Sequence, residues 1–166
     1  MPRRRYIVIA ATACAIAVWA AGCGSGTHHD ASSHRAKHTV LTQASLGFGA
    51  FHRFIWAPAR AGRFSDPGSH AVSQAAEAAR FTSNELRVTA HQVRGSKQLQ
   101  VLFAPLELTA DKISALRGTL SQHPSVAQVE AINKILLRIA VAAKENGARI
   151  ADASAAEIAA AGGPHA

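Results

Sequence analysis

Four histidines lie close together near the start of the chain, at His28, His29, His34 and His38. Neutral imidazoles bind Zn²⁺, Cu²⁺ and Ni²⁺, and a short histidine-rich tract is typical of metal binding. His34 and His38 would share a face if this piece of chain were helical. No carboxylate or cysteine completes a set with structural-zinc spacing. We therefore interpret the tract as a polar spacer, with metal binding as the alternative.

One thiol could undergo a different reaction. Cys23 follows three arginines at residues 3–5 and an apolar run from Tyr6 to Ala21. Residues 20–23 read Ala-Ala-Gly-Cys. They resemble the lipobox of bacterial lipoproteins, which is usually Leu-Ala-Gly/Ala-Cys. The departure is Ala20, which stands where leucine is commoner. The resemblance implies cleavage before Cys23, a diacylglyceryl group with acyl chains such as palmitate on its thiol, and a lipid-anchored location on the extracytoplasmic face of the cell membrane.

Other interpretations of this N-terminal segment remain open. An uncleaved membrane anchor needs roughly 20 apolar residues, and the run is shorter than that. An ordinary secretory signal or a twin-arginine signal would also have basic residues before an apolar stretch. The second cysteine, Cys14, would leave with the signal, so the mature domain would contain no disulfide, cysteine zinc site or cysteine nucleophile.

The densest aromatic stretch has five aromatic residues between Phe48 and Phe64. Phe48, Phe51 and Ile55 follow helical spacing, so we expect them to plug the end of an alanine-rich bundle. His52 beside them is expected to be a hydrogen-bonded packing residue. The alternative is an amphipathic contact surface for lipid or a partner. Its residues would be Phe51, Phe54, Trp56, Arg60 and Arg63.

No familiar catalytic motif occurs in the chain. The sequence has no nucleophile elbow, phosphate-binding Walker loop, dinucleotide fingerprint, His-Glu-x-x-His motif or calcium-binding loop. No nucleophile and base can be paired from their positions. These features predict a protein that is not an enzyme and has no cofactor beyond the diacylglyceryl group.

Composition limits the partners that can be expected. The chain has 166 residues and a formal net charge of +8, of which about +5 would remain without the three arginines of the signal. The remaining length suits one domain. A modest positive charge suits an anionic membrane surface or wall polymer. Nucleic acid is not expected, because the chain has no recognisable binding motif.

The expected elements are helices separated by proline and glycine. Residues 67–94 should form a long helix capped by Asp66, and residues 99–120 should form another with a kink or break at Pro105. A capping box at residues 125–128 should open a third long helix that ends at Asn146-Gly147.

These elements predict an all-α fold: an antiparallel bundle of three long helices plus a short N-terminal aromatic helix, preceded by a signal-peptide helix and a disordered linker. The expected divisions are a lipoprotein signal peptide at 1–22, a disordered linker at 23–43, a bundle at 44–150, and a short helical turn with a frayed tail at 151–166.

The aromatic, glycine and alanine pattern of the domain also resembles small actinobacterial exported proteins of unassigned function. Together these features predict a membrane-tethered extracytoplasmic lipoprotein that acts as a non-catalytic helical binding or structural module. Its partners would be the bilayer, through the acyl anchor, and another envelope protein or an anionic wall polymer. The alternatives are a metal-binding lipoprotein that uses the four histidines, and an enzyme whose site is not visible in the sequence.

Overall fold

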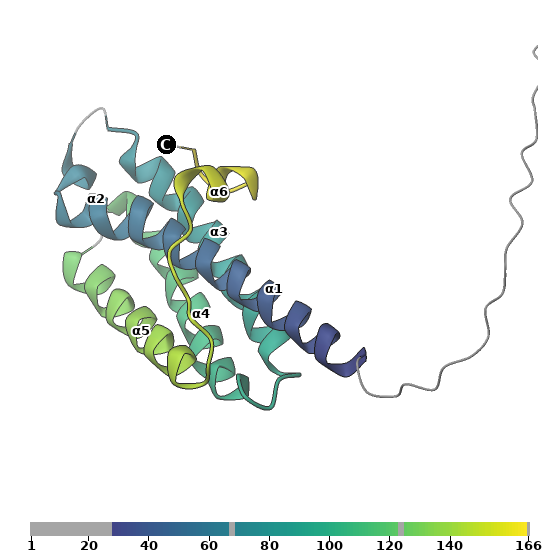
Figure 1. Cartoon of the computed structure of the whole chain (residues 1–166). Helices are drawn as coiled ribbons and strands as arrows, with labels where there is room; N and C mark the ends of the chain where they lie inside the picture. The colour runs from purple at the N-terminus through teal and green to yellow at the C-terminus, as the bar shows by residue number, and fades with distance from the viewer. Residues whose placement is uncertain (1–27, 67–68, 123–124, 166) are drawn as a thin grey trace, which may run out of the picture.

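The computed structural model describes residues 28–66, 69–122 and 125–165, and this part of the chain is all-α with no strand (Figure 1). The signal peptide and Cys23 lie outside the described residues. None of the described helices has the length and hydropathy needed to cross a bilayer. In chain order the elements are α1 (His28–Phe51), η1 (His52–Trp56), α2 (Ala57–Arg60), η2 (Arg63–Ser65), α3 (Ala71–Val93), η3 (Gln100–Leu102), α4 (Phe103–Thr119), η4 (Leu120–Gln122), α5 (Val126–Glu145) and α6 (Ala155–Ala160).

The first helix corrects the expected linker and the expected short aromatic helix. Residues 28–43 are not a linker, because α1 starts at His28 and includes the aromatic residues up to Phe51. No proline or glycine interrupts the chain between Gly26 and Gly47. Val40 is buried and lies eight residues before Phe48, so the apolar face continues upstream of the aromatic stretch.

Pro58 does not end this helical segment. Residues 52–56 form a π-helical turn, in which the backbone N–H of Ala57 donates to the carbonyl of His52, and α2 follows directly. Pro58 has no N–H to donate to the preceding turn, and its ring crowds the carbonyl four residues back. The wider turn accommodates the proline, so the helix runs on to Arg60.

The other long helices start and end near their expected positions, with four corrections. α3 starts at Ala71 rather than at residue 67, and the hydroxyl of Ser69 rather than Asp66 accepts from its first N–H. Pro67 lies outside the described residues.

Pro105 lies in the first turn of α4, where its missing N–H is harmless, so α4 has no kink there. α5 does follow Ser125, but the Ser125 side chain makes no capping bond. The predicted end at Asn146-Gly147 is confirmed, because Gly147 has a φ of 70° and Ala148 N–H donates to Ala143.

The C-terminal residues are also more ordered than expected. Residues 148–154, which we call the strap, run back from the end of α5 across α1 to α6 (Figure 1). A capping box between Ser154 and Glu157 opens α6, and Ile158 is fully buried. Gly163 donates to the Ile158 carbonyl, and Gln74 on α3 donates to the His165 carbonyl. The tail is therefore packed on the bundle and is not frayed.

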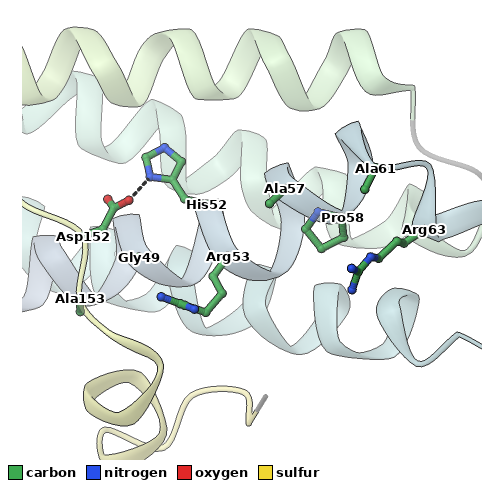
Figure 2. Close-up of a pocket in the computed structure, with 9 residues that line it drawn as sticks. All are labelled: Gly49, His52, Arg53, Ala57, Pro58, Ala61, Arg63, Asp152 and Ala153. Carbon is green, nitrogen blue, oxygen red and sulfur yellow. Dashed lines mark hydrogen bonds and ion pairs between the residues drawn. The ribbon is translucent and has the colours of Figure 1, made fainter.

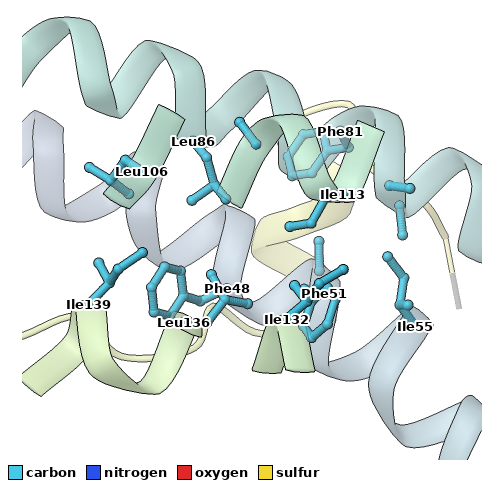
Figure 3. Packing of buried hydrophobic residues seen from close by; sticks show 14 of the residues in the cluster. Phe48, Phe51, Ile55, Phe81, Leu86, Leu106, Ile113, Ile132, Leu136 and Ile139 are labelled. Atoms are coloured by element: carbon cyan, nitrogen blue, oxygen red, sulfur yellow. The ribbon is translucent and has the colours of Figure 1, made fainter. Parts of the chain in front are cut away.

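A single apolar core joins the helices (Figure 3). Phe48, Phe51 and Ile55 are at most 3% exposed, which confirms that they plug the bundle. They meet side chains from three other helices: Phe81, Leu86, Leu106, Ile113, Ile132, Leu136 and Ile139. The aromatic stretch is thus part of the centre of the fold, and it fixes the position of the residues between its buried members.

Candidate functional site

A cleft of about 510 Å³ opens where the strap crosses the end of α1 (Figure 2). It is lined from η1 and α2 on one side and from the strap on the other. The lining residues are Gly49, His52, Arg53, Ala57, Pro58, Ala61, Arg63, Asp152 and Ala153. Residues about 100 positions apart in sequence therefore form one surface.

His52 ties three elements together at this cleft. Its Nδ1 lies 2.7 Å from Oδ2 of Asp152 on the strap, and its Nε2 lies 2.8 Å from Oδ1 of Asn133 on α5. Phe48, Phe51 and Trp56 surround the imidazole edge-on, with ring centroids 5.8–6.4 Å away. The expectation of a hydrogen-bonded packing histidine is therefore confirmed.

Both partners of His52 favour its charged form. Burial on its own lowers the pKa of His52, but the hydrogen bond and negative charge of Asp152, with the hydrogen bond to Asn133, outweigh that effect and raise the pKa above its usual value. Both ring nitrogens face acceptor oxygens, and only the doubly protonated ring has an N–H to donate to each of them. In that protonated form, the positive charge of the ring compensates the carboxylate of Asp152.

This arrangement differs from a catalytic histidine pair. In a nucleophile–histidine–carboxylate triad, one ring nitrogen contacts the carboxylate and the other takes the proton of the nucleophile. Here the second nitrogen is occupied by the amide oxygen of Asn133, and no described serine, threonine or cysteine hydrogen-bonds to the ring. The geometry holds the strap in place and leaves no ring nitrogen free to accept a proton.

Gly49 lets the strap approach α1 closely. A Cβ on Gly49 would lie 2.5 Å from the carbonyl oxygen of Ala153, closer than atoms of two packed segments can come. The N–H of Ala153 donates to the carbonyl of Ser45 at 3.0 Å, which pins the strap at this crossing. Asp152 is the residue before Ala153, so the glycine allows its carboxylate to reach His52.

Two arginines give the cleft its positive charge. Arg53 and Arg63 are exposed, and neither forms an ion pair within the described part of the chain. Figure 2 shows both guanidinium groups on the same side of the helical segment, while His52 points toward α5. An adjoining hollow of about 340 Å³ is lined by the same Arg53, Pro58 and Arg63, and extends to His70 and Gln74 on the α3 side.

The structure buries some residues of the expected contact surface and leaves others exposed. Phe51 is fully buried and Phe54 is 5% exposed, so neither presents an open surface to a lipid bilayer. Trp56 is half-buried, donates to Glu130 at 3.1 Å and stacks under Arg60, whose guanidinium lies 5.1 Å from the ring centroid. Only Arg63 of the five faces the cleft. The aromatic members of the expected surface therefore stabilise the fold instead.

The expected metal ligands lie on α1. His34 and His38 are four residues apart on a helical backbone, as the shared-face idea requires, but only His38 has a described side chain, and it is exposed. The structure describes only the backbone of His28, His29 and His34. No group of three or more metal-ligating side chains forms among those the structure describes.

Sequence reasoning missed the residues that organise the cleft. Asp152 and Asn133 lie 100 and 81 positions from His52, and nothing in their local sequence marks them. The only local signal was the pair Gly47 and Gly49 inside an otherwise helical pattern, since a glycine there often has a packing reason.

The chain matches no family model, no curated protein and no solved structure.

Proposed function

We propose that this protein is a membrane-tethered extracytoplasmic lipoprotein whose helical bundle is a non-catalytic binding module. The tether rests on the lipobox-like sequence ending at Cys23, after a basic and then an apolar segment. The observation that carries the binding role is the cleft itself. Its histidine is engaged on both ring nitrogens, while its two arginines have no ionic partner in the described chain.

The bundle would lie close to the membrane in this arrangement. Only four residues separate Cys23 from the start of α1, so the link from Cys23 to His28 spans at most about 18 Å. The start of α1 would therefore be held near the bilayer. The cleft lies at the other end of the helix, about 36 Å along its axis at His52.

Lipid attachment tests the tether. Replacing Cys23 with alanine or serine should abolish incorporation of a labelled fatty acid, and should leave either uncleaved precursor or soluble protein. The matched control is Cys14→Ser, which should leave labelling intact, because Cys14 would be removed with the signal. Labelled lipid in the Cys23→Ala variant would show that the tether is wrongly assigned.

A metal-binding lipoprotein is the second candidate. The helical backbone of α1 favours it, because histidines four residues apart on one helix face can share a metal ion. Calorimetry with Zn²⁺, Cu²⁺ and Ni²⁺, comparing the full chain with the His38→Ala variant, tests it. Tight one-to-one binding that the variant loses would place this candidate first. Weak binding unaffected by the substitution would remove it.

A further inference from the structure

We infer that the cleft between the strap and η1 is a binding site for a phosphate group, held by the guanidinium groups of Arg53 and Arg63. This inference deepens the proposed function, because it supplies the chemical class of the ligand of the binding module. It depends on three features of the cleft: its charge, the number of donors that it offers, and its position on the molecule.

The charge balance of the cleft is positive. Asp152 is its one acidic lining residue, and its Oδ2 is bound by His52 at 2.7 Å. That carboxylate is engaged by His52, and the two arginines outnumber it, so the lining has a net positive charge.

The number of donors favours phosphate over carboxylate. A guanidinium group binds an oxyanion best through two parallel N–H···O bonds. A carboxylate presents two oxygens in one plane, and one arginine can engage both of them. A phosphate group has three or four oxygens and can accept from both Arg53 and Arg63. These two arginines also line the adjoining hollow, so a phosphate between them would leave room for attached groups on either side.

The shape of the backbone explains how the two arginines share one surface. Arg53 is the second residue of η1, whose wider turn shifts the register of the residues that follow. Gly62 has a φ of 69° and reverses the chain after α2, which returns Arg63 toward the cleft. Pro58 lies between the two arginines on the cleft wall.

The position of the cleft favours a phosphate outside the supporting membrane. The strap crosses α1 near the end opposite to His28 (Figure 1), and the cleft lies at this crossing. The tether would hold the His28 end near the bilayer. A phosphate on a soluble molecule or an envelope polymer reaches this end freely. A headgroup of the supporting bilayer reaches it only if the domain lies flat.

Calorimetry of the full chain in non-ionic detergent tests the inference, with sodium phosphate and glycerol 3-phosphate as probes and succinate for comparison. Saturable one-to-one binding of the phosphate probes, tighter than that of succinate, is expected. Arg53→Gln and Arg63→Gln should each weaken it about tenfold, since each removes charged hydrogen bonds. The control is Arg138→Gln, an exposed arginine of α5 outside the cleft, which should change binding less than twofold.

Three outcomes would overturn the inference. The first is that the phosphate probes show no saturable binding, and the second is that Arg138→Gln weakens their binding as much as the cleft substitutions do. The third outcome is that the protein floats with phosphatidylglycerol vesicles only when both cleft arginines are present, while free phosphate does not bind. Thermal melts of each variant should match the parent, because the substituted side chains are exposed. The result is independent of the tether: fatty-acid labelling at Cys23 does not require these arginines, and phosphate binding in detergent does not require the anchor.

Discussion

At the level of single residues, the protonation of His52 affects the stability of the fold. It donates to Asp152 and Asn133, and so fastens the strap and α5 to the end of α1. The raised pKa means that the folded protein holds this proton more tightly than the unfolded chain does. The bonds of the imidazolium therefore contribute most at a pH below about 6.5, the value of an unperturbed histidine.

This linkage predicts how stability depends on pH. The contribution of His52 should be complete below pH 6.5 and should be lost as the pH rises through the raised pKa of the folded protein. Removing it in His52→Gln should cost about 1–2 kcal/mol at pH 5.5, since the carboxylate partner is half-exposed and partly screened. Denaturant unfolding at pH 5.5 and 8.5 checks this. A gap between parent and variant that is as large at pH 8.5 as at pH 5.5 would contradict the assignment.

Phe51 tests whether the aromatic stretch belongs to the core. It is fully buried, so Phe51→Ala should leave a cavity and cost about 3–5 kcal/mol of unfolding free energy. That is a large share of the roughly 5–15 kcal/mol typical of a domain. The matched control is Leu137→Ala on α5, where the side chain is 52% exposed and the cost should stay within about 0.5 kcal/mol. A melting temperature for Phe51→Ala within a degree or two of the parent would contradict the buried placement.

At the level of elements, the closeness of the strap to α1 depends on one missing side chain. Gly49→Ala places a Cβ 2.5 Å from the Ala153 carbonyl, so the strap must move away. We expect a cost of about 1–3 kcal/mol. We also expect the pKa of His52 to fall, because Asp152 moves with the strap and its hydrogen bond and charge raise that pKa.

Gly118→Ala on α4 is the matched control for this change. No atom lies within 4 Å of the added Cβ, and alanine favours a helix over glycine, so the substitution should be neutral or stabilise by up to about 1 kcal/mol. The imidazole titration of His52, followed by NMR, separates a displaced strap from a general loss of stability. An unchanged titration in Gly49→Ala would show that the strap tolerates the methyl group in place.

The same elements show what sequence can and cannot predict here. Phe51 was assigned to the core correctly because helical spacing of large apolar residues is a strong local signal. The start of α1 was missed because residues 28–39 are mostly polar or small, and Val40 is the first residue whose burial extends the core upstream. The bonds of His52 to Asp152 and Asn133 could not be predicted, because no local pattern encodes a contact across 100 positions.

At the level of the whole molecule, α1 sets the distance between the proposed tether and the cleft. α1 begins five residues after Cys23, whereas the sequence predicted a disordered linker of 21 residues at 23–43. The bundle packs along the second half of α1, around Val40 to Phe51. The anchored end and the binding end of the proposed module are therefore opposite ends of one helical segment.

This geometry makes a prediction about Trp56. The chain has two tryptophans, Trp19 and Trp56, and Trp19 lies in the segment that cleavage before Cys23 would remove. Trp56 would then be the sole tryptophan of the mature protein, about 42 Å along the helical segment from His28. Its fluorescence should be unaffected by brominated lipids when the lipidated protein is reconstituted into vesicles.

A tryptophan placed near the tether supplies the comparison. In a Trp56→Phe background, Arg35→Trp puts an indole at an exposed position about 10 Å from the start of α1, and brominated lipids should quench it more than they quench Trp56. Strong quenching of Trp56 in the parent would mean that the domain lies flat with its cleft against the bilayer. Lipid headgroups would then be the phosphate source within reach of Arg53 and Arg63 in the membrane, even if calorimetry in detergent shows that the cleft binds free phosphate.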